Sequence, residues 1–454
     1  MRFVMMTKIC GSKKSTPTRP LMSQGRVLFG FICILGLNPY LFAESSYSER
    51  TLAWADLVEL SVTHDPWLVR SKALQSASLF ESEAVAELPD PVMSASVLNL
   101  PTDSFDFSQE QMTQLWVGVS QEITRGTTRG YRKQIKVLEG EAQQIARTAR
   151  VRLIELQVTG LWLDLYLAHN TSRLIRQDKP LFQQLVDVTN ASYRHASSDT
   201  SQQDIIRVQL ELTRLEDRLL RLKDIQYSRK QEFAQWLPAS YLGSKMTWSL
   251  SDRLEVEPIM RTSEESQRAL LARHPDLRLI DRAIETKRVG LSLAQESTKP
   301  DWSVNASYAY RDEDRFGNDL ADFVSVGFRV KLPLYKQKRQ HKKIAAAAEL
   351  VSADESARLI RLQQLLQRYL TAYASLESLD ERLVLYRDTL LEQLATLVQA
   401  SLNAYTADQG SFSDVMRAYI ALLNAKIEVQ SMEVDRLKTL AEIRYLSVTR
   451  EAAA

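Results

Sequence analysis

Two aspartate-arginine pairs have the residue types and the spacing for charge chemistry. The chain of 454 residues contains DIIR from Asp204 to Arg207 and DVMR from Asp414 to Arg417. Residues three positions apart are neighbours on one face of a helix, and an exposed pair of this kind is worth roughly a few tenths of a kcal/mol. Taken alone, the pattern is most often a solvated local ion pair.

Enzymatic chemistry finds no support in the sequence. The five histidines are scattered, and none lies in an HExxH or other metal-ligand spacing: His64, His169, His195, His274 and His341. A P-loop, a dinucleotide-binding fingerprint and a GxSxG nucleophile elbow are all missing. The 10 methionines form no ladder for soft metals. We therefore expect no enzyme activity, no cofactor and no resident metal.

The composition favours long helices. Apolar residues make up 44% of the chain and charged residues 25%, and the formal net charge of +2 gives no reason to expect nucleic acid as a partner. The chain has only 14 glycines and 13 prolines, which is sparse for its length. Such a chain is expected to be mainly helical.

Residues 1–43 are expected to be a signal peptide, with Met22 as a possible true start. Several basic residues precede the apolar run from Val27 to Leu37, and Asn38-Pro39 leads to a possible cleavage site after Ala43. The run is too short for a membrane anchor. Both cysteines, Cys10 and Cys33, lie in this segment, so the mature chain is expected to form no disulfide.

An internal duplication organises the rest of the chain. A shift of 209 positions superposes Pro66 on Pro275, Leu68 on Leu277, Pro91 on Pro300, Gly118 on Gly327 and Ile123 on Leu332. A shift of 210 then superposes DIIR on DVMR. We expect a first repeat over 44–237, a linker over 238–263, a second repeat over 264–446 and a C-terminal tail over 447–454.

Each repeat contains two segments that alternate with a period of two, which predicts four strands per chain. They are Val92 to Leu100, Leu115 to Ile123, Trp302 to Tyr310 and Val324 to Leu332. Glu122, Arg329 and Lys331 lie opposite an aliphatic and aromatic face, which suits a barrel wall that is apolar toward lipid and polar toward its lumen. A small soluble sheet with one face in a core is the alternative. Four strands cannot close a membrane barrel, so strands must be pooled between chains.

Very long helices follow the strands. Residues 335–409 contain neither Gly nor Pro, and Leu359, Tyr369, Leu383 and Leu397 belong to an apolar stripe of heptad type. Seventy helical residues would extend about 105 Å. The matching helix of the first repeat is expected to start near Tyr131 and to be interrupted at Pro180, which should kink or overwind it. A periplasmic coiled-coil structural protein without a pore would explain these helices but not the strands.

Three segments give the chain a family resemblance. VGVSQEI after NLPTDS, VGFRVKLPLYKQ, and AYTADQGSFSDVMRAYIALLNAK resemble the TolC-type outer-membrane efflux proteins, and the resemblance covers residues 50 to 446. It implies a mixed α and β membrane protein: a homotrimer whose pooled strands form a twelve-stranded barrel continuous with a long helical tunnel. It places the protein in the outer membrane of a Gram-negative cell, with a long periplasmic extension.

The resemblance also implies a function. Such a protein is a passive exit duct that works with a periplasmic adaptor (membrane fusion) protein and an inner-membrane pump of the proton-driven resistance-nodulation-division (RND) class. The segment NLPTDSFDFSQEQMTQ is most similar to family members that serve metal-efflux pumps, so metal ions are the first expectation for the cargo. The exit duct of a type I protein secretion system is the alternative.

Finally, the resemblance assigns site residues. Asp414 matches an acidic gate position of the family, while Arg417 stands where a second acid is known, so Asp204, Arg207, Asp414 and Arg417 are expected to form a periplasmic gate of paired charges. Gly410 is expected to adopt a left-handed backbone in the turn. The adaptor-docking tip comprises Arg194, Ser198, Asp199, Tyr405, Gln409, Gly410 and Ser411, and the barrel lumen Glu122, Arg329 and Lys331.

Overall fold

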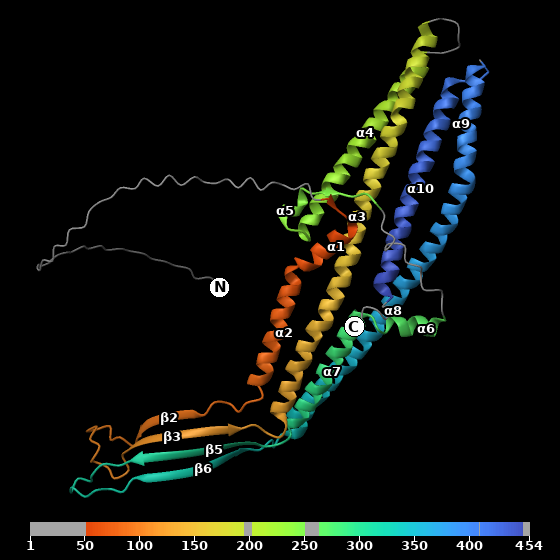
Figure 1. Ribbon diagram of the computed structural model, residues 1–454. Helices are drawn as coiled ribbons and strands as arrows, with labels where there is room; N and C mark the ends of the chain where they lie inside the picture. The colour runs from red at the N-terminus through yellow and green to blue at the C-terminus, as the bar shows by residue number, and fades with distance from the viewer. Residues whose placement is uncertain (1–50, 195–201, 250–262, 408, 448–454) are drawn as a thin grey trace, which may run out of the picture. The chain divides into compact units, whose positions relative to one another are not determined.

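A computed structural model describes residues 51–194, 202–249, 263–407 and 409–447 of the chain (Figure 1). The expected signal peptide, His195, the tip residues Ser198 and Asp199, and nearly all of the expected tail lie outside these ranges. No helix in the described part of the chain has the length and apolar character needed to cross a membrane.

The same order of elements occurs twice along the chain. Two helices precede two strands, and two long helical segments follow them. The first set is α1 (Trp54–Thr63), α2 (Pro66–Ala84), β2 (Val92–Leu98), β3 (Gln114–Ile123), α3 (Thr128–Arg194) and α4 (Gln202–Glu232). The second set is α6 (Glu264–Leu271), α7 (Pro275–Glu296), β5 (Asp301–Tyr310), β6 (Phe323–Lys331), α8 (His341–Leu385), α9 (Leu391–Thr406) and α10 (Phe412–Leu446).

A small parallel sheet that the sequence did not predict lies between the two sets. Strand β4 (Lys245–Met246) follows the short helices η1 (Phe233–Gln235) and α5 (Ala239–Leu242), and it pairs with β1 (Thr51–Leu52). Trp248 then stacks on His169 of α3, with the ring centroids 4.4 Å apart. The segment between the two sets is therefore fastened to the first helical hairpin.

In each set, proline and a capping side chain separate the first helix from the second. Asp65 caps α2 by accepting a hydrogen bond from the Trp67 backbone N–H (3.2 Å), and Arg150 pairs with its carboxylate at 2.8 Å. In α7 the cap is His274, whose Nδ1 accepts from the Asp276 N–H at 3.2 Å. Proline occupies the first turn in both helices, where its missing N–H costs nothing.

His274 should make the stability of the fold depend on pH. Burial lowers its pKa to about 4, with Arg152 and Arg361 acting in the same direction and Asp276 in the opposite one. An unfolded chain binds the proton near pH 6.5, so the contribution is complete above that pH and is lost as the pH falls toward 4. We expect a loss of about 2 kcal/mol in the free energy of unfolding between pH 7 and pH 5. Urea titrations of wild type and His274→Asn, which keeps a capping side chain, measure it. Equal losses in both proteins would contradict this assignment.

The four predicted strands form one antiparallel sheet in the order β2-β3-β5-β6 (Figure 1). Strands β3 and β5 join the two halves of the chain at the centre of the sheet, with Gly118 opposite Ser307. Strands β2 and β6 are its edges, and neither has a second neighbour in the described ranges.

The strand register gives the sheet two unlike faces, because residues directly opposite each other lie on the same face. One face is apolar apart from Gln121: Met93, Ala95, Val97, Leu115, Val117, Val119, Ile123, Trp302, Val304, Ala306, Tyr308, Tyr310, Val324, Val326, Phe328 and Val330. The other face is mainly polar. On it Ser303 lies between Glu122 and Arg329, and Lys331 lies opposite Asp301. The predicted alternation is confirmed.

Packing on the polar face explains why a glycine occupies position 118. Trp116 lies on this face two residues earlier, and a Cβ atom at Gly118 would come within 2.3 Å of its indole ring. The glycine therefore makes room for the ring to lie flat along the strand.

The long helices differ from expectation in two respects. Helix α3 starts at Thr128 and continues through Pro180, so the predicted interruption is wrong. Ile175 and Phe182, on either side of the proline, are buried against α4 and α10, and this packing holds the helix together. The second long helix contains two π-helical turns, η3 (Lys336–Gln340) and η4 (Tyr386–Leu390).

The predicted apolar stripe on that second helix is only partly buried. Tyr369 and Leu383 are buried, but Leu359 and Leu397 are 59% and 50% exposed. Leu365, which the heptad pattern omitted, is fully buried. A long surface helix drifts relative to a strict heptad, so its buried side follows the contacts that α7 and α10 actually make.

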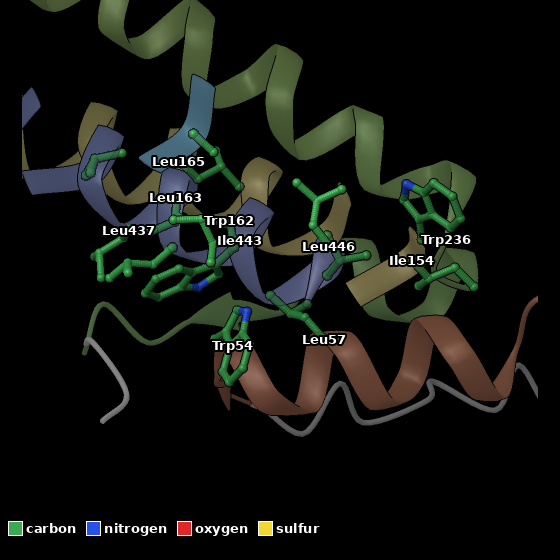
Figure 2. Close-up of a cluster of buried hydrophobic side chains, with 14 of the residues drawn as sticks. Trp54, Leu57, Ile154, Trp162, Leu163, Leu165, Trp236, Leu437, Ile443 and Leu446 are labelled. Carbon is green, nitrogen blue, oxygen red and sulfur yellow. The ribbon is translucent and has the colours of Figure 1, made fainter. Parts of the chain in front are cut away.

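One apolar core joins the two halves through α3 and α10. Figure 2 shows side chains of α1, α3 and α10 converging there, among them Trp54, Trp162 and Leu437. The indole N–H of Trp54 donates to Thr159 Oγ1 at 3.0 Å inside this core. A second cluster, with Phe182, Val208, Phe412 and Met416, lies between α3, α4 and α10. These cores fix the helical hairpins relative to each other.

Candidate functional site: a hairpin tip and a two-faced sheet

The turn between α9 and α10 is built around the N-terminus of α10. Ser411 caps the helix: its Oγ accepts a hydrogen bond from the Asp414 backbone N–H (3.2 Å) and donates one to Asp414 Oδ2 (2.8 Å). This is a serine N-cap: the hydroxyl satisfies one orphan backbone N–H of the helix start, and the Asp414 carboxylate in turn accepts from that hydroxyl. Asp414 therefore has a structural function, and the S-x-x-D spacing in the sequence could have revealed it.

Gly410 differs from the prediction. Its backbone is not left-handed, since the glycines with positive φ in the described chain are Gly126 and Gly317. A Cβ atom at Gly410 would instead lie 3.0 Å from the Cβ atom of Ala404. The turn needs a small residue for close approach to α9, and Tyr405 closes the same turn by packing edge-on against Phe412.

Asp414 and Arg417 form an ion pair on the surface of α10. Their side chains are 51% and 74% exposed. The hydrogen bond from Ser411, followed by the nearby Arg417 guanidinium, lowers the pKa of Asp414 below its usual range. The carboxylate is therefore ionised at neutral pH, and in the single chain the pair matches the solvated local contact that the spacing suggested.

Arg207 reaches the same turn from the first hairpin. Its Nη1 donates to Ser413 Oγ at 3.2 Å, which connects α4 to the first turn of α10. A pocket of about 230 Å³ lies here, lined by Arg207, Glu211, Phe412, Ser413, Met416, Arg417 and Ile420. The structure therefore brings Arg207, Asp414 and Arg417 together from separate hairpins. Asp204 lies in the first turn of α4, one helical turn before Arg207, and its side chain is outside the description, as is that of Arg194 at the end of α3.

Sequence reasoning missed Ser413 and Glu211. Ser413 carries the contact between the hairpins, and Glu211 places a carboxylate beside two arginines. Ser413 belongs to no recognisable motif, because its contact joins residues 206 positions apart. Glu211 also pairs with Arg214 three residues later, and this local spacing could have indicated it.

A larger groove lies on another side of the tip, between α9 and α10. Its volume is about 600 Å³, and small side chains line much of it: Ala400, Ser401, Ala404, Ala418 and Ala421. The predicted tip residues Gln409 and Gly410 lie at its edge together with Asp414 and Arg417. Small residues let another helix approach closely, so the groove has the form of a helix-binding surface.

The polar face of the sheet carries the three residues predicted for the lumen. Glu122, Arg329 and Lys331 are all exposed, and they lie near the ends of β3 and β6 that lead into long helices. Serine and asparagine side chains occupy the middle of this face, at Ser120, Ser303, Asn305 and Ser307 among others. The face could border water along its whole length.

A metal centre has no basis in the part of the chain that is described. No three His, Cys, Asp or Glu side chains within it are placed to hold one metal ion.

Comparison with solved structures identifies the architecture. The sequence matches no protein-family model and no curated protein. The structure resembles CusC, which forms a transmembrane channel, with a TM-score of 0.72 over 87% of this chain and 92% of that chain, at 12% identity. This chain has the fold of an outer-membrane channel protein. The resemblance to TolC-type proteins is thereby confirmed at the level of the fold.

Further channel structures share this fold. The outer-membrane protein VceC of Vibrio cholerae matches with a TM-score of 0.68 and 16% identity over 87% of this chain and 95% of that chain. The outer-membrane channel OprN matches with a TM-score of 0.70 and 15% identity over 87% and 89%. At these identities the shared fold assigns no role to individual residues, and function depends on the chemistry of the surfaces.

Proposed function

We propose that this protein is the exit duct of a tripartite efflux system, located in the outer membrane of a Gram-negative cell and extending into the periplasm. It exports small solutes passively and performs no enzymatic chemistry. The observation that carries the proposal is the two-faced sheet: one face is apolar and exposed, the other is polar, and neither edge strand has a second neighbour among the described residues. The wall of a water-filled barrel in lipid has these two faces, and its edge strands have to be paired with other strands.

The dimensions of the sheet support a membrane position. From Trp302 to Tyr310, strand β5 extends about 26 Å at 3.3 Å per residue. Tilted by about 40°, as the strands of outer-membrane barrels are, it covers about 20 Å of an apolar band that is about 25 Å tall and has aromatic girdles at both borders. Trp302 at one end of β5 and Tyr308 and Tyr310 at the other lie on the apolar face and are 45–47% exposed. Glu122, Arg329 and Lys331 then face the lumen.

The open edges support a homotrimer. Unpaired strand edges are not tolerated in hydrocarbon, so β2 and β6 must pair with other chains. Each chain supplies four strands to the sheet, and three chains then give the twelve-stranded barrel of TolC-type channels.

The charged cluster at the hairpin tips is proposed as the periplasmic gate. A trimer surrounds one mouth with three copies of Asp204, Arg207, Asp414 and Arg417. Replacing Arg207 and Arg417 by Ala should leave an excess of carboxylates, raise cation selectivity and loosen the closed state through repulsion. Replacing both Asp residues should shift selectivity toward anions.

Conductance in planar bilayers tests both the duct and the gate. We expect wild type to form pores, and the two double variants to shift the reversal potential in a salt gradient in opposite directions. Identical reversal potentials in all three proteins would mean that these aspartates and arginines are solvated surface pairs and do not form a gate. A wild type that forms no pores would remove the duct itself from the proposal.

The hairpin tips are the proposed contact for the periplasmic adaptor, which in turn binds an RND-type inner-membrane pump. This surface comprises Arg194, Ser198, Asp199, Tyr405, Gln409, Gly410 and Ser411. The groove of small side chains between α9 and α10 supports a helical partner there. Gln409→Trp, placed at the edge of the groove, should stop export in cells while pore conductance stays at the wild-type value. Normal export by this variant would place the contact elsewhere.

Metal ions are the proposed cargo, because the segment between β2 and β3 resembles that of family members that serve metal-efflux pumps. Two of its carboxylates are engaged locally, since Gln109 donates to Asp103 and Ser108 donates to Asp106. A deletion strain that tolerates metals as well as its parent would exclude this cargo.

A further inference from the structure

The junction between β6 and α8 carries unpartnered positive charge. Lys336, Lys338, Arg339, Lys342 and Lys343 are exposed, and within the described ranges none of them forms an ion pair. Leu334 and Tyr335, directly before them, are 78% and 76% exposed. This surface lies at the β6 edge of the sheet, and no described residue of the chain covers it.

The opposite edge of the sheet has unpartnered negative charge at the corresponding level. Glu83, Glu87 and Asp90 lie at the end of α2 and in the segment that leads into β2, and all three are exposed. None of them forms an ion pair in the described chain, whereas the neighbouring Glu81 binds Lys136 at 2.8 Å. The two edges are therefore complementary in charge.

At the centre of the sheet, a junction between a strand and a helix contacts a junction between a helix and a strand. Where β3 enters α3, the Thr127 backbone N–H donates to Glu296 Oε2 at 3.2 Å, from the end of α7. Arg125 binds Asp301 at 3.0 Å and donates to the Ser297 carbonyl at 3.2 Å across the same seam. The Glu296 side chain is only 9% exposed. A strand-to-helix junction of one half thus binds the helix-to-strand junction of the other.

The internal duplication assigns the counterparts of these residues. The shift of 209 positions that superposes Pro91 on Pro300 also superposes Glu87 on Glu296, Lys336 on Thr127 and Lys338 on Arg129. Glu87 and Lys336 are attached to opposite edges of the sheet, separated by β3 and β5. The equivalent contact therefore cannot form within one chain in this register.

We propose that Glu87 of one copy binds the turn from Lys336 to Lys338 of a second copy, with Glu83 and Asp90 completing an acidic surface against the basic one. This inference rests on the proposed function, in which the barrel is built from several chains. Strand β2 leads away from α2 and β6 leads into α8, so antiparallel pairing of β6 with β2 of the next copy brings the two junctions together. The contact is head-to-tail and repeats until the ring closes.

Anionic lipid headgroups are the competing occupant of the basic turn. They would explain the exposed Lys side chains, but they would leave the acidic surface at the other edge without a partner. Glu87 occupies the same position in the first repeat as Glu296 does in the second, and Glu296 already makes the equivalent contact inside the chain. This correspondence favours a second copy of the chain over lipid as the partner.

Charge reversal tests the inference on the full chain in detergent. Glu87→Lys alone, or Lys336→Glu with Lys338→Glu, should lower the oligomer fraction in light scattering about tenfold or more, because like charges then face each other. The triple variant that carries both changes should restore the oligomer. Glu110→Lys and Lys223→Glu, which reverse exposed charges away from the junctions, should have no effect. Unchanged circular dichroism shows that each variant is folded.

Cross-linking tests the same contact without changing its charge. With Cys10 and Cys33 replaced by Ser, the pair Glu87→Cys and Lys336→Cys should give covalent multimers after mild oxidation, and each single cysteine should not. The inference would be overturned if no covalent multimers appear and the charge-reversal variants still form pore-forming oligomers. That result would leave the proposed function intact. A wild type that is monomeric and forms no pores would overturn both.

A third result distinguishes lipid. If Lys336→Glu with Lys338→Glu abolishes binding to vesicles containing phosphatidylglycerol while Glu87→Lys leaves the oligomer unchanged, the basic turn binds headgroups and the proposed contact is wrong.

Discussion

Arginine in place of Val326 should prevent the chain from entering membranes, whereas arginine in place of the neighbouring Ser325 should not. Val326 lies at the middle of β6 opposite Ala306 on the apolar face and is 77% exposed. Ser325 lies opposite Ser307 on the polar face. An arginine on the lipid face of a barrel costs about 2–4 kcal/mol at the membrane midplane, but one in the lumen remains hydrated. In the proposed trimer every chain carries the change, so the cost is incurred three times.

Refolding into lipid vesicles measures this effect. We expect Val326→Arg to leave nearly all protein outside the vesicles, and Ser325→Arg to insert like wild type and to shift pore selectivity toward anions. Because the two positions are adjacent on one strand, local strand propensity affects both equally. Equal insertion of the two variants would mean that the apolar face is covered by protein instead of lipid.

Replacement of Trp162 by Ala should destabilise the fold by about 3–5 kcal/mol. Trp162 is fully buried in the core that joins α1, α3, α8 and α10, and it stacks on Tyr166 with a centroid distance of 5.3 Å. Its indole N–H has no hydrogen-bond partner in the described chain. The loss therefore arises from a cavity and lost apolar burial, and hardly from hydrogen bonding.

Urea unfolding followed by far-ultraviolet circular dichroism measures this loss. Phe316→Ala is the matched control, since Phe316 is also a large aromatic residue but is 88% exposed in the segment between β5 and β6. We expect its effect to stay within about 0.5 kcal/mol. A Trp162 variant as stable as this control would mean that the two halves of the chain are held together elsewhere.

The hairpin tip illustrates where sequence reasoning was insufficient. The DVMR segment correctly placed an ion pair on the first turn of a returning helix, because spacing along one helix is a local property. The hydrogen bond from Ser411 to Asp414 depends on the conformation of the turn. The contact of Ser413 with Arg207 depends on the position of the other hairpin. For Gly410 the prediction was wrong because a turn can need glycine for small size as well as for backbone conformation.

Helix α3 shows a similar limit. Proline weakens the interior of a helix, and propensity alone predicts an interruption at Pro180. The buried residues on both sides of it belong to a core shared with α4 and α10, and tertiary packing of this kind outweighs one lost hydrogen bond. Nothing in the residues next to Pro180 could indicate those contacts.

The sequence by itself determined the strands, their two faces, the long helices and the duplication of the whole pattern. These are properties of periodicity: a period of two defines a strand face, and a repeated order of patterns predicts repeated structure. The tertiary structure alone decided that β3 and β5 pair at the centre, that β2 and β6 remain as open edges, and that Arg207 meets Ser413. Such contacts join residues far apart in the chain, and their formation depends on packing of the complete fold, which no local pattern encodes.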